Sequence, residues 1–378
     1  MALSAPIERI GAWRSGDHPG HRQFATLFSK SPLRLESGAS FGPITLAYQT
    51  WGELNLQRDN AILLLHGFSG DSHAAGSICP GHPTAGWWDE LIGSGRAIDT
   101  DCFFVICPNA FGSCHGSTGP ASLDLAGRPF GSRFPSITIR DMVAVEHALS
   151  QQLGIHHWHA IIGGSMGGMR ALEWAVTWPL AAERLLLMAT GAYATADQIS
   201  LHSTQIRAIE LDPNFNGGDF YSHAASPPLQ GLGLARSIAE ISYGSERQYQ
   251  LAFQRLPEPG VNPITGGRYA VEAFLEQHSE TVARRLDANS YICLTKAMSH
   301  HDIGRNRGGY QQALRSIRAR TRIVSVSSDR LFPPCLQQEI AASIQSGVTF
   351  TTIHSLYGHD GFLCEHRQLA PIVSQVLG

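Results

Sequence analysis

Ser165 lies in a five-residue stretch that combines a nucleophilic side chain with flanking glycines. Residues 163–167 read Gly-Gly-Ser-Met-Gly, a Gly-x-Ser-x-Gly pattern between an apolar run typical of a strand and a run compatible with a helix. Glycines on both sides remove Cβ atoms from a sharp strand-to-helix turn, so the serine can adopt a strained backbone and present its hydroxyl above a sheet. A plain Gly/Ser-rich loop is the alternative, but the flanking runs favour a nucleophilic serine.

Two later residues supply the groups that such a serine needs. A serine hydroxyl requires an adjacent base, and a third group must orient that base. Asp329 follows an apolar run at 323–326, just past the end of an expected strand, and His359 lies in a glycine-flanked stretch after the next one. Asp329 alone could be an ordinary loop cap, and His359 is one of 18 histidines. Their order and their positions at strand ends nevertheless predict a Ser–His–Asp triad.

Attack by the serine on an acyl group also requires donors for the negative charge that develops on the carbonyl oxygen. Two backbone N–H groups usually provide them, one from the residue after the nucleophile and one from an earlier strand-to-helix loop. Met166 is the first of these donors. The second falls in the loop Leu63–Asp71, where Phe68 is the expected donor.

The elements that must position these residues are short apolar runs alternating with a helical pattern. Apolar residues recur at helical spacing over 139–154, between the third and fourth of the expected strands. This alternation favours a mostly parallel sheet covered by helices on both faces, an α/β fold. The expected strands are Ile44–Tyr48, Ala61–Leu65, Phe103–Cys107, Trp158–Ile162, Leu185–Met188, Arg322–Ser327 and Thr349–His354.

The segment between the fifth and sixth expected strands has a different character. Its pattern is helical with proline-rich breaks and contains no comparable strand. We therefore expect one α/β core, formed by residues 1–191 and 313–378, with an all-helical insertion at 192–312. The expected helices of the insertion are Ala196–Glu210, Gly231–Ser245, Glu246–Gln254 and Ala270–Ser299.

Composition excludes several classes of partner. The net charge of −3 and the charged fraction of 16% give no electrostatic reason to expect binding to nucleic acid or to an acidic membrane. The chain shows neither a secretory signal nor an apolar run long enough to span a membrane, and its seven cysteines contain no CxxC pair. We expect a cytoplasmic protein with reduced thiols. The His156–His159 and His300–Asp302 clusters lack a second ligand set, so no metal site is expected.

Five motifs in register give the chain a resemblance to a known family. From about Leu46 onwards the sequence resembles the homoserine O-acetyltransferases. The resemblance implies an α/β-hydrolase fold with a helical lid, a homodimer, and transfer of an acyl group from acyl-CoA to the hydroxyl of L-homoserine through an acyl-serine. It implies acetyl-CoA as co-substrate and no bound cofactor. The motifs are Gly70–Gly76, Gly86–Asp89, Gly112–Pro120, Phe134–Asp141 and Gly163–Gly168.

The same resemblance assigns two substrate-binding residues. Arg236 and Asp360 match family positions that hold the amino-acid acceptor, and a zwitterion buried under a lid needs one cation and one anion. Arg236 can grip the carboxylate bidentately, while Asp360 can pair with the ammonium. The sequence departs from the family pattern at Gly67, where alanine is common, and at His115, where glutamine or asparagine is usual. These departures bear on donor preference and on water exclusion.

Four functions remain compatible with the sequence. The first is homoserine O-acetyl transfer. A second keeps the mechanism but uses succinyl-CoA as donor or serine as acceptor, because discrimination by one methylene amounts to only about 1–3 kcal/mol. A third is a plain esterase, in which water takes the acyl group. The last is a binding protein of the same fold that has lost catalysis, which the intact triad order disfavours.

Overall fold

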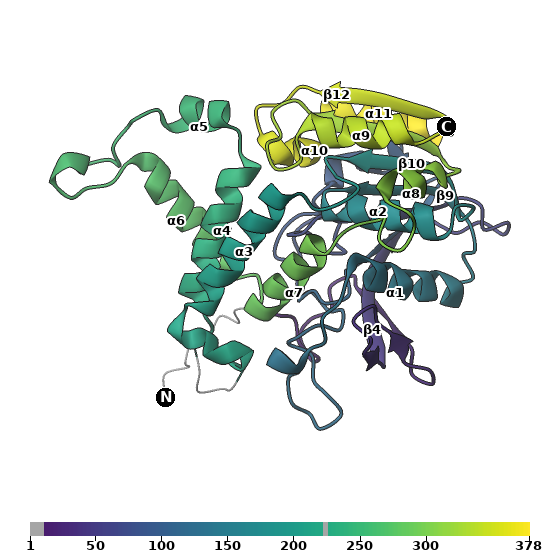
Figure 1. The fold of residues 1–378 in the computed structure, drawn as a ribbon, viewed down its shortest axis with the longest axis horizontal. Helices are drawn as coiled ribbons and strands as arrows, with labels where there is room; N and C mark the ends of the chain where they lie inside the picture. The colour runs from purple at the N-terminus through teal and green to yellow at the C-terminus, as the bar shows by residue number, and fades with distance from the viewer. Residues whose placement is uncertain (1–10, 222–225) are drawn as a thin grey trace.

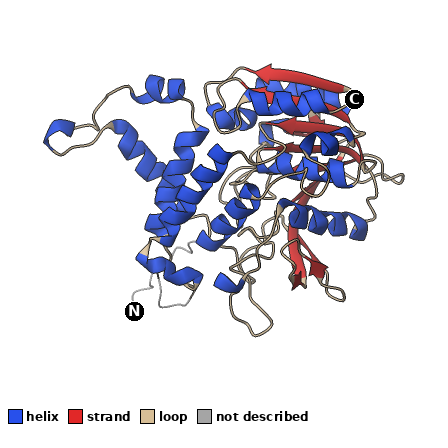
Figure 2. Ribbon diagram, in the orientation of Figure 1, coloured by secondary structure: helices blue, strands red, loops and turns tan. Residues whose placement is uncertain are grey.

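The computed structural model describes residues 11–221 and 226–378. Its main sheet has eight strands in the order β1-β4-β8-β5-β9-β10-β11-β12. Figure 2 shows the strands in red with helices, in blue, packed against them. β4 runs antiparallel to both of its neighbours, whereas every pair from β8 to β12 is parallel, which confirms the mostly parallel sheet. These strands are β1 (Gln23–Leu27), β4 (Ile44–Trp51), β5 (Ala61–Leu65), β8 (Phe104–Pro108), β9 (Trp158–Gly164), β10 (Ala182–Met188), β11 (Arg320–Val326) and β12 (Val348–Ile353). Two small pairs lie outside the main sheet: β2 (Leu33–Arg34) with β3 (Ser40–Phe41), and β6 (Ile92–Gly93) with β7 (Ile98–Asp99).

Alternate residues of the central strands pack into two separate layers of the core. Leu63 and Leu65 of β5 belong to the apolar cluster that includes helices α1 (Ile139–Gln152), α2 (Met166–Thr177) and α9 (Pro334–Ser343). Ile62 and Leu64 belong to the cluster on the other side, with α11 (His366–Leu377). Because successive strand residues point to opposite faces, a fully apolar strand requires helices on both of them. The fold is therefore the expected α/β sandwich of helix, sheet and helix.

The described residues between β10 and β11, here called the helical insertion, contain helices and no strand of the main sheet. Figure 1 shows α3 and α4 on the side of the core, α6 on the outer side of α4, and the segment between α5 and α6 reaching away from the core. The expected single helix Ala270–Ser299 is wrong, because Asp287 accepts a hydrogen bond from the Ser290 N–H and caps a second helix there. The domain boundaries at 191/192 and 312/313 stay a prediction. The helices are α3 (Ala196–Glu210), α4 (Leu229–Tyr243), α5 (Glu246–Phe253), α6 (Ala270–Ala283), α7 (Ala288–Ser299) and α8 (Tyr310–Arg315).

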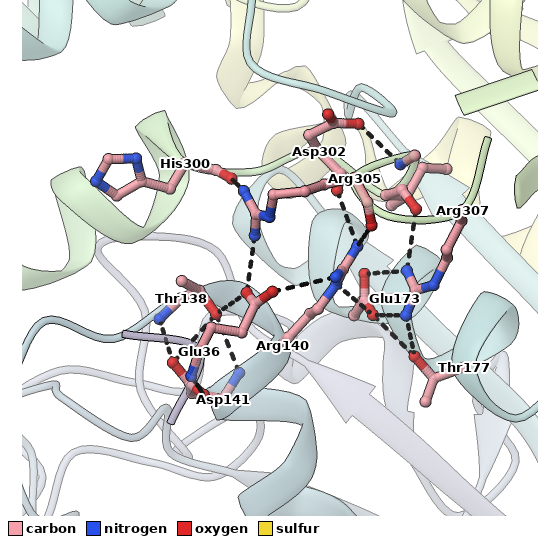
Figure 3. A network of polar contacts seen from close by, with 12 residues as sticks. Glu36, Thr138, Arg140, Asp141, Glu173, Thr177, His300, Asp302, Arg305 and Arg307 are labelled. Atoms are coloured by element: carbon pink, nitrogen blue, oxygen red, sulfur yellow. Dashed lines mark hydrogen bonds and ion pairs between the residues drawn. The ribbon is translucent and has the colours of Figure 1, made fainter. Parts of the chain in front are cut away.

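A network of ion pairs ties the segment after α7 to the core (Figure 3). Glu173 of α2, whose side chain is 2% exposed, accepts Arg307 at 2.5 Å and Arg140 at 3.2 Å. Arg305 and Arg140 also pair with Glu36, at 2.7 and 3.1 Å. These contacts hold the end of the helical insertion against α1 and α2. They thereby connect it to the helix that begins at the nucleophile-bearing turn.

Candidate active site

Ser165 occupies the turn between β9 and α2 with φ 55° and ψ −126°, a backbone conformation that is strained for a residue with a Cβ. Its N–H donates to the Met188 carbonyl at 3.0 Å, which helps to hold the turn. A Cβ on Gly163 would overlap the Gly167 carbonyl, and one on Gly167 would overlap the Leu65 carbonyl. The two glycines are thus required by close backbone approach, as the sequence pattern predicts.

The structure brings together the three residues expected to form the triad. The Nε2 atom of His359 lies 2.8 Å from the Ser165 hydroxyl, and its Nδ1 lies 2.7 Å from Asp329 Oδ2. Asp329 follows β11, and its Oδ1 accepts the backbone N–H groups of Leu331 and Phe332 at 2.9 and 2.8 Å. His359 lies in a short 3₁₀ turn after β12. This geometry satisfies the nucleophile–base–acid arrangement that acyl transfer requires.

The electrostatics of His359 suit a general base. Burial disfavours the charged imidazolium, but the nearby negative charge of Asp329 and its hydrogen bond outweigh burial and raise the pKa of His359 above its ordinary value. Phe332 stacks on the imidazole with ring centroids 5.1 Å apart, and Phe362 meets it edge-on. The aromatic walls therefore fix the plane of the ring while Asp329 fixes its rotation.

The two expected oxyanion donors border the same serine. Met166 is the first residue of α2, so its N–H has no partner within the helix. Within the described ranges, neither this N–H nor that of Phe68 donates to another residue. A Cβ built on Gly67 would lie 3.7 Å from the Ser165 Cβ, which places the loop after β5 directly beside the nucleophile. Both N–H groups are available to a developing oxyanion, and the positive end of α2 favours it as well.

A cavity of about 140 Å³ opens onto Ser165 and His359, and Asp360 and Tyr243 line it with them. Burial raises the pKa of Asp360 above that of an ordinary carboxyl, while the neighbouring His359 and Arg236 act in the opposite direction. Of the two sequence-predicted acceptor-binding residues, Asp360 lines this cavity, whereas Arg236 lies behind it and contacts two of its lining residues, Ser69 and Tyr243.

Arg236, on α4, is only 3% exposed. Its guanidinium lies 5.3 Å from the centre of the Tyr243 ring, and its Nη1 donates to the Ser69 hydroxyl at 3.2 Å. Sequence reasoning missed Tyr243. Its signal was present in the spacing, because residues seven apart on a helix share a face and Tyr243 is two turns beyond Arg236.

His115 does not line the cavity at Ser165. It is half-buried and lines a separate cavity of about 520 Å³ that Arg22, Asp71 and Arg285 also line. Trp87, by contrast, lines the cavity at Ser165, and its indole N–H donates to the Asp71 carbonyl at 3.0 Å. The two cavities are thus separated by the loop that ends at Asp71.

Over residues 11–221 and 226–378, no group of three or more His, Cys, Asp or Glu side chains is arranged to hold a metal ion. In the same residues, no helix is both long enough and apolar enough to cross a bilayer.

Comparison with known proteins identifies the family. Residues 60–363 match the alpha/beta hydrolase fold family. The chain is 50% identical over 372 residues to a homoserine O-acetyltransferase of Thermobifida fusca (strain YX), covering 98% of each chain, and 46% identical to that of Clavibacter michiganensis subsp. michiganensis, covering 97% and 95%.

Two solved structures are similar over nearly the whole chain. The homoserine O-acetyltransferase from Bacillus anthracis is 29% identical with a TM-score of 0.87, and the alignment covers 94% of this chain and 97% of that one. Esterase E22 is 30% identical with a TM-score of 0.86, covering 94% and 99%. The chain therefore belongs to the homoserine O-acetyltransferase family of the α/β-hydrolase fold.

Proposed function

We propose that the protein transfers an acetyl group from acetyl-CoA to the hydroxyl of L-homoserine, giving O-acetyl-L-homoserine for methionine biosynthesis. The observation that carries this proposal is the Ser165–His359–Asp329 chain of hydrogen bonds at a cavity flanked by one buried arginine and one carboxylate. The relatives that match nearly the whole length of the chain bear this activity in their names. The reaction requires no bound cofactor, and acetyl-CoA is a co-substrate.

The first half of the reaction acylates the serine. His359 takes the proton of the Ser165 hydroxyl as the oxygen attacks the thioester carbonyl. The N–H groups of Phe68 and Met166 stabilise the resulting oxyanion, and His359 returns its proton to the departing sulfur of CoA. Asp329 holds the imidazole and stabilises its charged form throughout.

The second half transfers the acetyl group to the acceptor. Arg236 binds the homoserine carboxylate and Asp360 binds its ammonium, which directs the hydroxyl towards His359. His359 then removes the hydroxyl proton while the oxygen attacks the acyl-serine. This orientation matters because the bound hydroxyl must outcompete water for the same intermediate.

A third, smaller cavity also borders the nucleophile, and its size and polarity favour an acetyl donor over a succinyl donor. This cavity of about 20 Å³ is lined by Ser165, Phe68 and Thr295 among other residues, and none of the described residues that line it is an arginine or a lysine. It has room for a group about the size of one water molecule. The distal carboxylate of a succinyl group would be buried there without a cation, which is costly. The names of the relatives point to acetyl as well.

Hydrolysis is the second candidate function. Esterase E22 shares the fold over nearly the full length of both chains, and Gly67 leaves the nucleophile less enclosed than a residue with a Cβ would. Water is then the acceptor, and the acylation half of the mechanism is unchanged. The measurement that separates the two functions is the fate of the acetyl group.

We also propose that the enzyme is a cytoplasmic homodimer. On α4, Leu234, Ile238 and Ile241 recur at helical spacing, and Leu234 and Ile241 are 56% and 47% exposed, which suits an apolar contact between two copies. The seven cysteines are all free, as expected for a reducing compartment.

The decisive experiment measures thiol release from acetyl-CoA and succinyl-CoA, each with homoserine, serine or no acceptor. Mass spectrometry of labelled acetyl products determines the partition between O-acetylhomoserine and acetate. We expect acetyl-CoA and homoserine to give rapid thiol release and mainly O-acetylhomoserine, and Ser165→Ala to abolish thiol release while the protein remains folded. Near-wild-type turnover by folded Ser165→Ala would contradict the acyl-serine mechanism, and acetate as the main product at saturating homoserine would favour the esterase.

A further inference from the structure

The loop after β5, which carries the Phe68 donor, is held by contacts of His66, the first residue after the strand. His66 is fully buried at the end of β5, and its Nδ1 lies 2.7 Å from the Gly67 carbonyl oxygen. The Nε2 atom lies 3.0 Å from the backbone N–H of Ala110, in the loop after β8. The imidazole therefore joins two loops at the carboxyl edge of the sheet.

These contacts determine the tautomer of His66. A backbone N–H can only donate, so Nε2 must present its lone pair to Ala110 and the ring proton must reside on Nδ1. The Nδ1–H group then donates to the Gly67 carbonyl. Burial and the positive charge of Arg170 lower the pKa of His66 to about 3, so the ring stays neutral at any ordinary working pH.

The Gly67 carbonyl belongs to the same peptide unit as the Phe68 N–H. This peptide is trans, and in a planar trans peptide the C=O and N–H bonds point in opposite directions. The Gly67 oxygen accepts a second hydrogen bond, from the Gly70 N–H at 3.1 Å. Two hydrogen bonds thus fix the orientation of the carbonyl, and with it that of the Phe68 N–H on the opposite side of the peptide.

The preceding peptide, which joins His66 to Gly67, is also held. Arg170, which is fully buried, donates to the His66 carbonyl at 3.3 Å and to the Pro108 carbonyl at the same distance. Glu146 anchors this guanidinium through contacts of 2.6 and 2.7 Å. The peptides on both sides of Gly67 are therefore restrained, one by Arg170 and the other by His66 and Gly70.

We propose that His66 is a positioning residue that, through its Nδ1–H bond to Gly67, aims the Phe68 N–H at the oxyanion of the acyl-transfer transition state. The proposal rests on the proposed function, because it assumes that Ser165 is acylated. It assigns to His66 no contact with substrate. Its effect is preorganisation, which acts on the rate of the chemical step rather than on substrate binding.

Two substitutions separate the two hydrogen bonds of the ring. In His66→Asn the amide nitrogen can take the place of Nδ1 and donate to Gly67, but the side chain is too short to reach Ala110. In His66→Gln the longer side chain can accept from Ala110 but presents no donor at the Nδ1 position. We expect His66→Gln to lower kcat for acylation by 4-nitrophenyl acetate about 10-fold or more with little change in KM, since losing an oxyanion donor outright costs about 10²–10³-fold. His66→Asn should recover most of that loss.

Two further readouts distinguish positioning from a merely structural role. Methylboronic acid forms a tetrahedral, negatively charged adduct with an active-site serine, and its affinity should fall in His66→Gln by about the same factor as kcat. Nitrogen-15 NMR of histidine-labelled wild-type protein should show His66 with its proton on Nδ1, unchanged between pH 6 and 9. This second measurement needs no substitution and so remains informative if a variant does not fold.

The outcomes are distinct from those that test the proposed function. If the wild type is acylated and Ser165→Ala is not, the nucleophile is established whatever His66 does. Full kcat and boronate affinity in folded His66→Gln, or an Nε2–H tautomer in the wild type, would then overturn the role of His66. Equal losses in the Gln and Asn variants, in parallel with lower melting temperatures, would also overturn it, because the side chain would then contribute stability alone.

Discussion

Replacing Asp329 with asparagine is expected to reverse the tautomer of the catalytic histidine. Asp329 Oδ1 accepts two backbone N–H groups, from Leu331 and Phe332, so that position must remain an oxygen. The new amide NH₂ group then occupies the place of Oδ2, 2.7 Å from His359 Nδ1. Two donors cannot face each other, so Nδ1 must give up its proton. The ring proton moves to Nε2, which faces Ser165.

The size of the effect follows from this exchange. With a proton on Nε2 the imidazole cannot accept the proton of the Ser165 hydroxyl. A small fraction of the protein keeps the proton on Nδ1, but it lacks the negative charge of Asp329 that stabilises the imidazolium. We expect kcat for thiol release to fall about 10⁴-fold, the loss typical of this substitution in Ser–His–Asp triads and about 5.5 kcal/mol of activation free energy. The overall fold should survive, because the side chain keeps its shape.

The assay is steady-state thiol release from acetyl-CoA with saturating homoserine, with Ser165→Ala as the baseline and circular dichroism as the control for folding. Acylation by 4-nitrophenyl acetate should fall in parallel, because both reactions need the same base. A folded Asp329→Asn variant that loses less than about 10-fold would refute the reasoning. It would indicate that Asp360, next to the histidine in the chain, or another group orients the imidazole.

Four further outcomes are expected. The pKa of His359 is raised and the neutral ring is the base, so kcat/KM for acylation should fall as the pH drops through a value above the ordinary 6.5; an inflection below 6.5 would contradict this. Arg236→Lys keeps the charge but loses the planar fork, so the homoserine KM should rise about 10- to 100-fold while acylation by acetyl-CoA changes little; unchanged homoserine kinetics would place the carboxylate elsewhere. Asp360→Ala should shift labelled acetyl from homoserine towards acetate, and an unchanged ratio would exclude its role in orienting the acceptor. Glu173→Gln should lower the free energy of unfolding in urea by about 3 kcal/mol, at the low end for a broken buried pair because its arginine partners are partly exposed. Glu258→Gln, in a solvent-exposed pair, is the control and should lose far less; equal losses would refute the assignment.

The parts of the fold that the sequence predicts are those encoded by local chemistry. The strand Ala61–Leu65 and the helix Ala196–Glu210 have the predicted bounds, because an unbroken apolar run and a threonine-capped amphipathic run each define their own ends. The break between α6 and α7 was missed because an aspartate cap within a long helical pattern resembles an ordinary polar position. The edge strand β1 was missed as well, because its extended conformation depends on its pairing with β4 more than on its own sequence pattern.

The candidate site likewise has residues that the sequence identifies and contacts that only tertiary packing creates. Ser165, Asp329 and His359 can be found from sequence because each follows a strand and because glycines flank the serine and the histidine. Their catalytic roles remain proposals that the experiments above test. The contact of His66 with Ala110 could not be predicted, since Ala110 is brought to the ring only when β5 and β8 pair. The separate cavity at His115 depends in the same way on tertiary packing.

The pairing of β10 with β11 has a consequence for the time course of folding. Leu185 lies opposite Thr321, so this strand pair closes a loop that includes the whole helical insertion. Loop-closure entropy delays contacts between residues so far apart in the sequence. Until β11 pairs with it, the unpaired edge of β10 can template aggregation. On the ribosome, the edge of β10 emerges long before β11 is synthesised. Early collapse of the helices between them would shorten the effective loop, and we therefore expect refolding yield to depend more on the stability of those helices than on that of the sheet.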